Sequence, residues 1–302
     1  MSAVFHGIEL DREGKPAWLR FSMLRLLYRL YATNTNGPRA ADWRRRLNSE
    51  GFRHQASHFR QCVGKFDRAA GYVARCRDAA GGALGRYSEK INRHQKGEIA
   101  QPPDAVSDPD RLTLDEVNAD LPVFLDSMLF YLSIQADSFA KLVPYFYEDA
   151  SAGICTRNFT KQLRWFCDGK LPYDLAYISI LKQNRTWRDQ LVGWNNGLRG
   201  VVAHESGILG VGWAKPKDGL IEPRTSLYRS DGVVEENVFE ALKVITAGWF
   251  AFLDDAYRHF APRLTDAGIL PIGFIDEFEK TRFFDADELR GLWAYPILKL
   301  KA

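Results

Sequence analysis

The sequence has few cysteines and no long uninterrupted run of apolar residues. Its four cysteines among 302 residues form no Cys-x-x-Cys pair, and their separations suit no zinc ribbon or finger. The most apolar stretch, residues 21–31, is interrupted by Arg25 and Arg29 and is shorter than the roughly 20 residues that a bilayer requires. We therefore expect free, partly buried thiols and no membrane helix, although Cys155 and Cys167 could pair in an oxidising compartment.

Signals for export and for the common nucleotide or hydrolase sites are missing too. His6, Glu9 and Asp11 lie where a signal peptide would carry a basic and then an apolar segment, so we expect a cytoplasmic protein. The sequence has neither a glycine-rich phosphate loop nor a Gly-x-Ser-x-Gly elbow. His54 and His58 have the spacing of zinc ligands, but no third ligand follows. We predict no metal and no cofactor.

Acidic residues are scarce in one part of the chain. Residues 39–96 contain 14 Lys and Arg against five Asp and Glu, a local balance of +9, whereas the whole chain carries +3. On a helix, four arginines of this region would form one stripe, because they are seven, eight and seven residues apart: Arg53, Arg60, Arg68 and Arg75. Such a stripe is either a track for nucleic-acid phosphates or a solvated helix face. We predict that it binds RNA.

Apolar residues recur at intervals of three and four along most of the chain, a pattern that predicts amphipathic helices. The expected helices cover residues 16–31, 42–80, 113–143, 156–166, 173–203 and 234–260. Gly81 and Gly82 are expected to end the second helix, and Thr113 and Glu116 to form a capping box at the start of the third. The predicted fold class is an all-α, up-and-down helical bundle.

Two segments interrupt the helical pattern. Residues 97–109 are rich in Pro, Gly and Asp, which predicts a linker and a boundary between an N-terminal basic helical region, 1–105, and a helical bundle, 106–302. Residues 207–232 combine glycines with short runs of β-branched and aromatic residues, which predicts a small β-hairpin inserted before the last helix.

The segment Leu198-Arg-Gly-Val-Val-Ala-His204 lies at the end of one predicted helix and precedes another, which begins with Glu235 and Glu236. This Arg-x4-His arrangement resembles the signature motif of the HEPN superfamily, and the order of elements over residues 113–260 resembles that family too. The resemblance implies an HEPN-like bundle that forms a homodimer, in which two copies of the motif meet and cleave RNA without a metal.

The resemblance also assigns roles to residues. Arg199 would stabilise charge on the phosphate in the transition state, and His204 would transfer a proton to or from the ribose or the leaving oxygen. Residues five apart on a helix point about 140° away from each other, so the site requires either unwinding at Gly200 or a second copy of the chain. Neighbouring polar residues would orient the imidazole or bind substrate: Asn195, Asn196 and Glu205.

Three alternatives remain open. The chain could be a nucleotide-binding helical protein that does not cleave RNA. Arg53 and His58 also fit the Arg-x4-His pattern, from within the basic helix. Gly200 stands where many active members of the superfamily carry Asn or Asp, so the chain could be an inactive HEPN-like module. It would then serve as a binding or assembly surface in a defence or toxin–antitoxin system, with an antitoxin or another defence protein as its partner.

Overall fold

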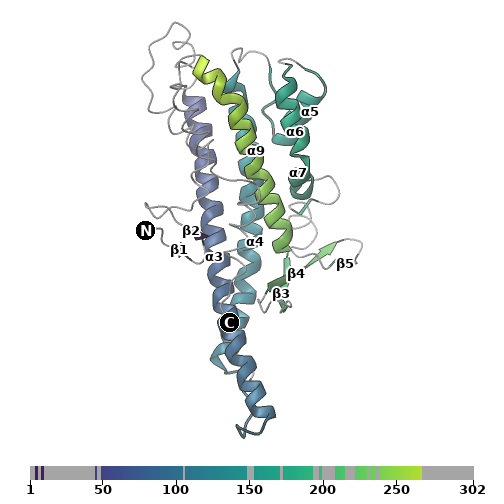
Figure 1. Cartoon of the computed structure of the whole chain (residues 1–302). Coiled ribbons are helices and arrows are strands. Elements are labelled where there is room, and N and C mark those ends of the chain that lie inside the picture. The colour runs from purple at the N-terminus through teal and green to yellow at the C-terminus, as the bar shows by residue number, and fades with distance from the viewer. Residues whose placement is uncertain are drawn as a thin grey trace.

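Three long helices dominate the structure, a computed structural model (Figure 1). It describes residues 45, 49–104, 106–147, 153–170, 173–192, 197–198 and 238–266, together with the backbone of five strands. Helix α3 (Glu50–Gln95) and helix α4 (Pro109–Leu142) form an antiparallel hairpin, and α9 (Val238–Asp266) packs beside it. The helical character confirms the predicted all-α class.

The long helices are joined by aromatic side chains. Phe59 of α3 contacts Phe139 of α4, with ring centroids 6.4 Å apart, and Phe139 in turn contacts Phe252 of α9 at 5.5 Å. Phe66 of α3 reaches Phe250 of α9 at 6.5 Å. All five rings are buried, so the faces of the three helices that carry them converge on one apolar core, which stabilises the bundle by removing these rings from water.

Four short helical segments follow α4: the 3-10 turn η2 (Val143–Phe146), α5 (Phe159–Cys167), α6 (Leu175–Gln183) and α7 (Arg185–Val192). Helices α5, α6 and α7 lie on the opposite side of the bundle from α3 (Figure 1). Trp187 of α7 anchors them, because its ring lies 5.0 Å from that of Trp249 in α9 and 5.4 Å from that of Phe159 in α5.

The strands form two small antiparallel sheets. Strands β3 (Ile208–Ala214), β4 (Glu222–Arg229) and β5 (Gly232–Val234) pair in that order, with a register irregularity between Leu209 and Val211. They occupy the segment for which the sequence predicts a hairpin, and β3 and β4 lie beside the lower ends of α4 and α9 (Figure 1). A two-residue pair, β1 (Val4–Phe5) and β2 (Ile8–Glu9), lies near the N-terminus.

Two predicted helix boundaries are wrong. Gly81 and Gly82 do not end a helix, because α3 continues to Gln95, where Gly97 (φ 75°) adopts the left-handed conformation that terminates it. Neighbouring Ala80 and Ala83 are completely buried, so packing of this segment overrides the low helix propensity of two glycines, about 1 kcal/mol each.

Helix α4 begins at Pro109 rather than at a capping box, since Asp108 accepts a hydrogen bond from the Asp110 amide.

A third predicted helix, over residues 173–203, is interrupted at Asn184, which separates α6 from α7. The Asn184 amide donates to the Ile180 carbonyl at 3.0 Å and to Asp255 of α9 at 3.1 Å. An asparagine side chain that bonds nearby backbone in this way competes with the helix itself. The predicted helix over residues 16–31 and the N-terminal part of that over residues 42–80 lie outside the described residues.

Both predicted regions contribute to one core. Phe59 precedes the predicted boundary at residue 105 and Phe139 follows it, yet they belong to the same cluster of buried side chains. Residues 97–109 therefore connect two helices of one hairpin in the described structure. The separation into regions 1–105 and 106–302 remains a prediction about the sequence.

The cysteines are free, as predicted, but only Cys76 and Cys155 are partly buried, whereas Cys62 is buried and Cys167 is exposed. Among the described residues, one helical stretch, Pro109–Phe146, is long and apolar enough to cross a membrane. Length and apolar composition of this kind are also found in the core helices of water-soluble proteins. Because α4 places Leu121, Leu125 and Met128 in the core, its apolar character has an explanation within the bundle.

Asp126 of α4 supplies a prediction about stability. Its Oδ1 atom is buried without a hydrogen-bond partner, and burial raises the pKa of this carboxyl to about 6 from its usual 3.8. Since the folded state then binds the proton more tightly than the unfolded state, the free energy of unfolding falls as the pH rises from about 4 to 6 and stays reduced above that range.

We expect Asp126→Asn to raise the free energy of unfolding at neutral pH by roughly 1 kcal/mol, less than the full pKa shift implies, because solvent screens this half-buried group. Urea denaturation near pH 7.5 and near pH 4.5 measures the effect, which should shrink at the lower pH. Asp120→Asn, at an exposed position on the same helix, is the control. Equal effects of Asp126→Asn at both pH values would contradict the expectation.

Candidate nucleic-acid interface

The residues that the sequence assigns to catalysis lie outside the described residues. These are Arg199 and His204, with Asn195, Asn196 and Glu205 beside them. Their segment follows α7, which ends at Val192, and precedes β3, which begins at Ile208; between these elements the structure describes Gly197 and Leu198, both buried. The assignment of a catalytic motif therefore stays a prediction.

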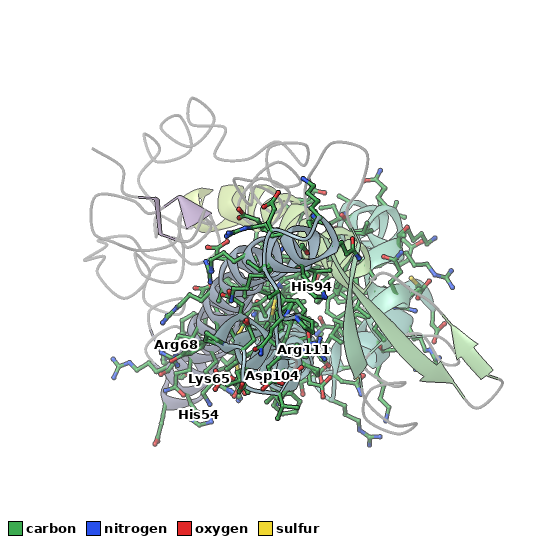
Figure 2. The ribbon with its side chains drawn as sticks, turned by 90° about the horizontal axis from the view of Figure 1, so that it is seen from below. His54, Lys65, Arg68, His94, Asp104 and Arg111 are labelled. Atoms are coloured by element: carbon green, nitrogen blue, oxygen red, sulfur yellow. The ribbon has the colours of Figure 1, made fainter. Side chains whose placement is uncertain are left out.

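The arginine stripe lies on α3, where Arg53, Arg68 and Arg75 are exposed. The side chain of Arg60 is outside the described residues, although its backbone continues the helix. Lys65 is exposed on the same helix, and Figure 2, viewed along the bundle, shows Lys65 and Arg68 on one side of α3 together with His54. Part of α3 thus presents several cationic side chains to solvent.

Aromatic rings lie among these cations. Tyr72 of α3 is 43% exposed and stacks on Phe124 of α4, with centroids 4.8 Å apart and planes inclined by 13°. The Arg75 guanidinium carbon lies 4.6 Å from the centre of the Tyr72 ring, and the Lys65 ammonium lies 5.4 Å from that of Tyr131 in α4. Each cation is therefore held against a ring by a cation–π contact.

We call this surface the basic–aromatic face, defined by Lys65, Arg68, Tyr72 and Arg75 of α3 and by Phe124 and Tyr131 of α4. The four α3 residues are spaced three, four and three apart, which places them on one side of the helix. The opposite side of α3 carries Phe66 and Val73, which are buried in the core. Cations and accessible rings on one surface are the combination that binds the phosphates and bases of single-stranded nucleic acids.

A pocket of about 460 Å³ lies at the end of the hairpin where α3 begins. It is lined by Gln55 of α3, Lys141 of α4, Pro144 and Tyr145 of η2, and Thr156 before α5. His58 of α3 is affected by charges from both regions. Its pKa is lowered first by burial, and then by the charges of Lys141 in the pocket, of His54, and of Lys65 on the basic–aromatic face. The neutral form of this histidine is therefore favoured.

The second fit to the Arg-x4-His pattern, Arg53 and His58, lies within the regular helix α3. Side chains five residues apart on such a helix point about 140° away from each other. His58 Nδ1 lies 3.8 Å from the Cys62 sulfur one turn later. These two residues of one chain therefore do not converge on a small group such as a phosphate.

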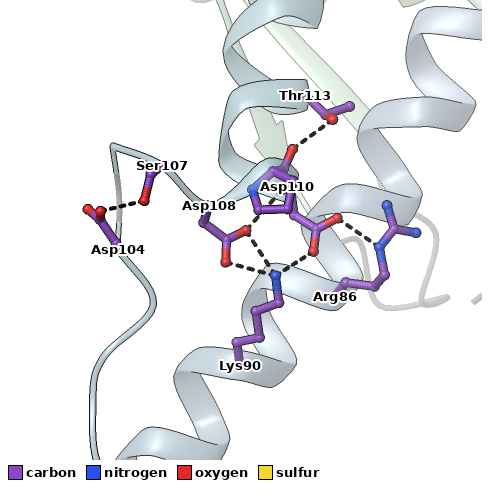
Figure 3. Close-up of polar contacts among 8 residues, drawn as sticks. Arg86, Lys90, Asp104, Ser107, Asp108, Asp110 and Thr113 are labelled. Atoms are coloured by element: carbon purple, nitrogen blue, oxygen red, sulfur yellow. Dashed lines mark hydrogen bonds and ion pairs between the residues drawn. The ribbon is translucent and has the colours of Figure 1, made fainter.

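Cations near the tip of the hairpin are held by carboxylates (Figure 3). The Lys90 ammonium donates to both oxygens of Asp108, at 2.9 and 2.7 Å, and to Asp110 at 2.9 Å, while Arg86 Nε donates to Asp110 at 2.8 Å. The bonds to Lys90 lower the pKa of both carboxyls, and the bonds to Asp108 and Asp110 raise the pKa of Lys90. This network joins the two helices and leaves little net charge for a polyanion.

A second polar cluster lies at the opposite end of the bundle. Asp174 accepts hydrogen bonds from the Tyr177 amide, the Tyr147 hydroxyl and His259 Nε2, at 3.0, 3.0 and 2.7 Å. The sequence places His259 at the end of the last helix, but α9 continues to Asp266, so the histidine ties the C-terminal part of α9 to α6. Because Asp174 is buried and caps α6, the cluster has a structural role.

The sequence did not identify Lys65, Tyr72, Phe124 and Tyr131 as interface residues. Phe124 and Tyr131 are partly buried, at the seam between α3 and α4. The spacing of Lys65, Arg68, Tyr72 and Arg75 indicates that cationic and aromatic side chains share one side of α3. Which α4 residues pack against them depends on the register of the hairpin, and periodicity alone does not predict that register.

Within the residues that the structure describes, no three His, Cys, Asp or Glu side chains are grouped as metal ligands. Comparison of the chain with protein-family models, curated proteins and solved structures gives no match in any of the three.

Proposed function

We propose that this protein binds single-stranded RNA through the basic–aromatic face and, as an HEPN-like helical bundle with a hairpin insertion, cleaves it without a metal at Arg199 and His204 in a homodimer. The observation that carries the proposal is the exposed arrangement of Lys65, Arg68 and Arg75 around the stacked rings of Tyr72 and Phe124.

Single-stranded RNA suits this face better than a duplex does. Cations spaced along a helix can pair with successive phosphates, and unpaired bases can stack on aromatic rings or on a guanidinium plane. In a duplex the bases are stacked on one another, so no base would present a free ring surface to an aromatic side chain such as Tyr72. The cytoplasmic location expected from the sequence is compatible with an RNA substrate.

The catalytic part of the proposal depends on the motif resemblance. A histidine with a pKa near neutrality can take the proton of a ribose 2′-hydroxyl or protonate the departing 5′-oxygen. One imidazole performs one of these tasks at a time, so two copies of His204 across a dimer would perform both. Two copies of Arg199 would stabilise the negative charge that accumulates on the phosphate.

A second candidate function is a non-catalytic assembly module whose partner is another protein, such as an antitoxin or defence component. Exposed apolar side chains on α4 favour it: Leu112, Val123 and Phe130 are 47%, 60% and 48% exposed. Their separations of 11 and seven residues place them on one line along the helix. Such a line is a feature of protein-binding surfaces.

Titration with single-stranded RNA at several salt concentrations tests the binding proposal. We expect Lys65→Gln with Arg68→Gln to weaken binding and to lower the slope of log affinity against log salt by about 1.4, since each cation on a single strand contributes about 0.7. The matched control is Arg164→Gln with Lys182→Gln, which removes the same charges from exposed positions on α5 and α6. Equal losses in both double variants would show non-specific attraction and would contradict the proposed face.

A further inference from the structure

The pocket at the end of the hairpin where α3 begins has the chemistry of an oxyanion site. Of the five described residues that line it, four can donate hydrogen bonds: the Gln55 amide, the Lys141 ammonium, and the hydroxyls of Tyr145 and Thr156. Among the residues that the structure describes, no carboxylate lines it. In the described part of the chain Lys141 has no ion pair, unlike Lys90 at the hairpin tip, so its charge is available to a ligand.

The pocket is also large enough for more than one phosphate group. Its volume of about 460 Å³ lies within the roughly 300–1,000 Å³ of ordinary ligand pockets. The Tyr145 ring, held edge-on by Phe52 at 5.1 Å, and Pro144 provide apolar walls beside the donors. A sugar or base attached to a bound phosphate would contact these walls.

Helix ends near the pocket favour an anion as well. Gln55 lies in the second turn of α3, and Thr156 lies three residues before α5, so the positive ends of two helix dipoles are close by. Among the described residues, an acid lies at each of these two helix ends. Glu50 is exposed in the first turn of α3. The Asp137 carboxylate accepts a hydrogen bond from the Phe159 amide, so it lies at the start of α5.

We infer that this pocket binds a terminal phosphate of the RNA, with Lys141 as the cation and Gln55, Tyr145 and Thr156 as neutral donors. The inference rests on the proposed function, because the chain that carries the terminal phosphate would continue past His58 onto Lys65 and Arg68. A terminal phosphomonoester suits Lys141 better than an internal diester does, because near neutral pH it carries between one and a half and two charges rather than one. The phosphate could belong to the 5′ or to the 3′ end.

The test compares one single-stranded oligonucleotide in three forms: with a 5′-phosphate, with a 3′-phosphate and with neither. We expect one phosphorylated form to bind wild-type protein about tenfold more tightly than the unphosphorylated form, as one charge-assisted hydrogen bond implies. Lys141→Met should abolish this preference, and Thr156→Val, at an exposed loop position, should reduce it. Lys65→Met is the matched control, because it should weaken binding of all three forms and leave the preference intact.

The outcomes separate this inference from the proposed function. If wild type binds all three forms equally, or if Lys141→Met keeps the preference, the pocket assignment is wrong while RNA binding stands. If no RNA binds, calorimetry should compare the binding of a nucleoside monophosphate with that of its nucleoside. Binding of the monophosphate that depends on Lys141 would then support the pocket and refute the proposed function, whereas its absence would refute both.

Discussion

His204→Ala is expected to reduce RNA cleavage at least 100-fold in the presence of EDTA, and Arg199→Ala is expected to do the same. Loss of a general acid–base group typically costs 10²–10⁴ in rate, and loss of one group that stabilises transition-state charge costs 10²–10³. Wild-type cleavage should survive EDTA because neither role needs a metal. The measurement is the rate of cleavage of a single-stranded RNA by wild type and both variants.

His94→Ala and Arg164→Ala are matched controls for these substitutions, because both positions lie outside the motif and the basic–aromatic face. His94 contacts the Ile99 carbonyl at the hairpin tip, and Arg164 is exposed on α5. Both control variants should cleave at the wild-type rate. If wild type does not cleave RNA that it binds, the assembly module becomes the better proposal. If His58→Ala abolishes cleavage and His204→Ala does not, the motif copy in α3 is the functional one.

Gly248→Ala is expected to destabilise the protein by about 1–3 kcal/mol, the usual cost of forcing an extra carbon into a packed core. A Cβ atom at Gly248 of α9 would lie 2.6 Å from Cβ and 3.0 Å from Cγ of Trp187 in α7. Trp187 is buried among Phe159, Trp249 and Phe252, so it has no empty space to enter. Helix α7 must shift away from α9, which weakens the contact that anchors the short helices.

Gly85→Ala provides the control for this substitution. Gly85 is exposed on α3, and a Cβ atom there would meet nothing within 4 Å. Alanine is the better helix former by about 1 kcal/mol, so this variant should be slightly more stable than wild type. Urea denaturation of the three proteins measures both effects. A Gly248→Ala variant as stable as Gly85→Ala would mean that α7 and α9 do not pack as described.

Helix periodicity predicted α4, α5 and the greater part of α3 and α9 from the sequence, because each buries one apolar stripe. It failed where packing or capping outweighed local preference. Gly81 and Gly82 stay helical beside buried Ala80 and Ala83, and Asn184 divides a stretch whose apolar spacing is continuous. These outcomes depend on neighbours from other elements, which spacing along the chain does not reveal.

The interface was predictable only in part for the same reason. The excess of Lys and Arg over residues 39–96 indicated α3 as a polyanion surface, and the arginine spacing indicated one stripe. The rings of Phe124 and Tyr131 join that stripe through the register of the α3–α4 hairpin. The pocket brings Gln55, Lys141 and Thr156 together from three segments, a juxtaposition that no local motif encodes.

Ultraviolet crosslinking of a bound single-stranded RNA, with the adducts located by mass spectrometry, tests RNA binding by the basic–aromatic face most directly. Aromatic side chains stacked on bases are favourable crosslinking partners, so we predict adducts on the peptides that contain Tyr72, Phe124 and Tyr131. Adducts confined to α5, α6, α7 and α9, with none on α3 or α4, would contradict the proposed face.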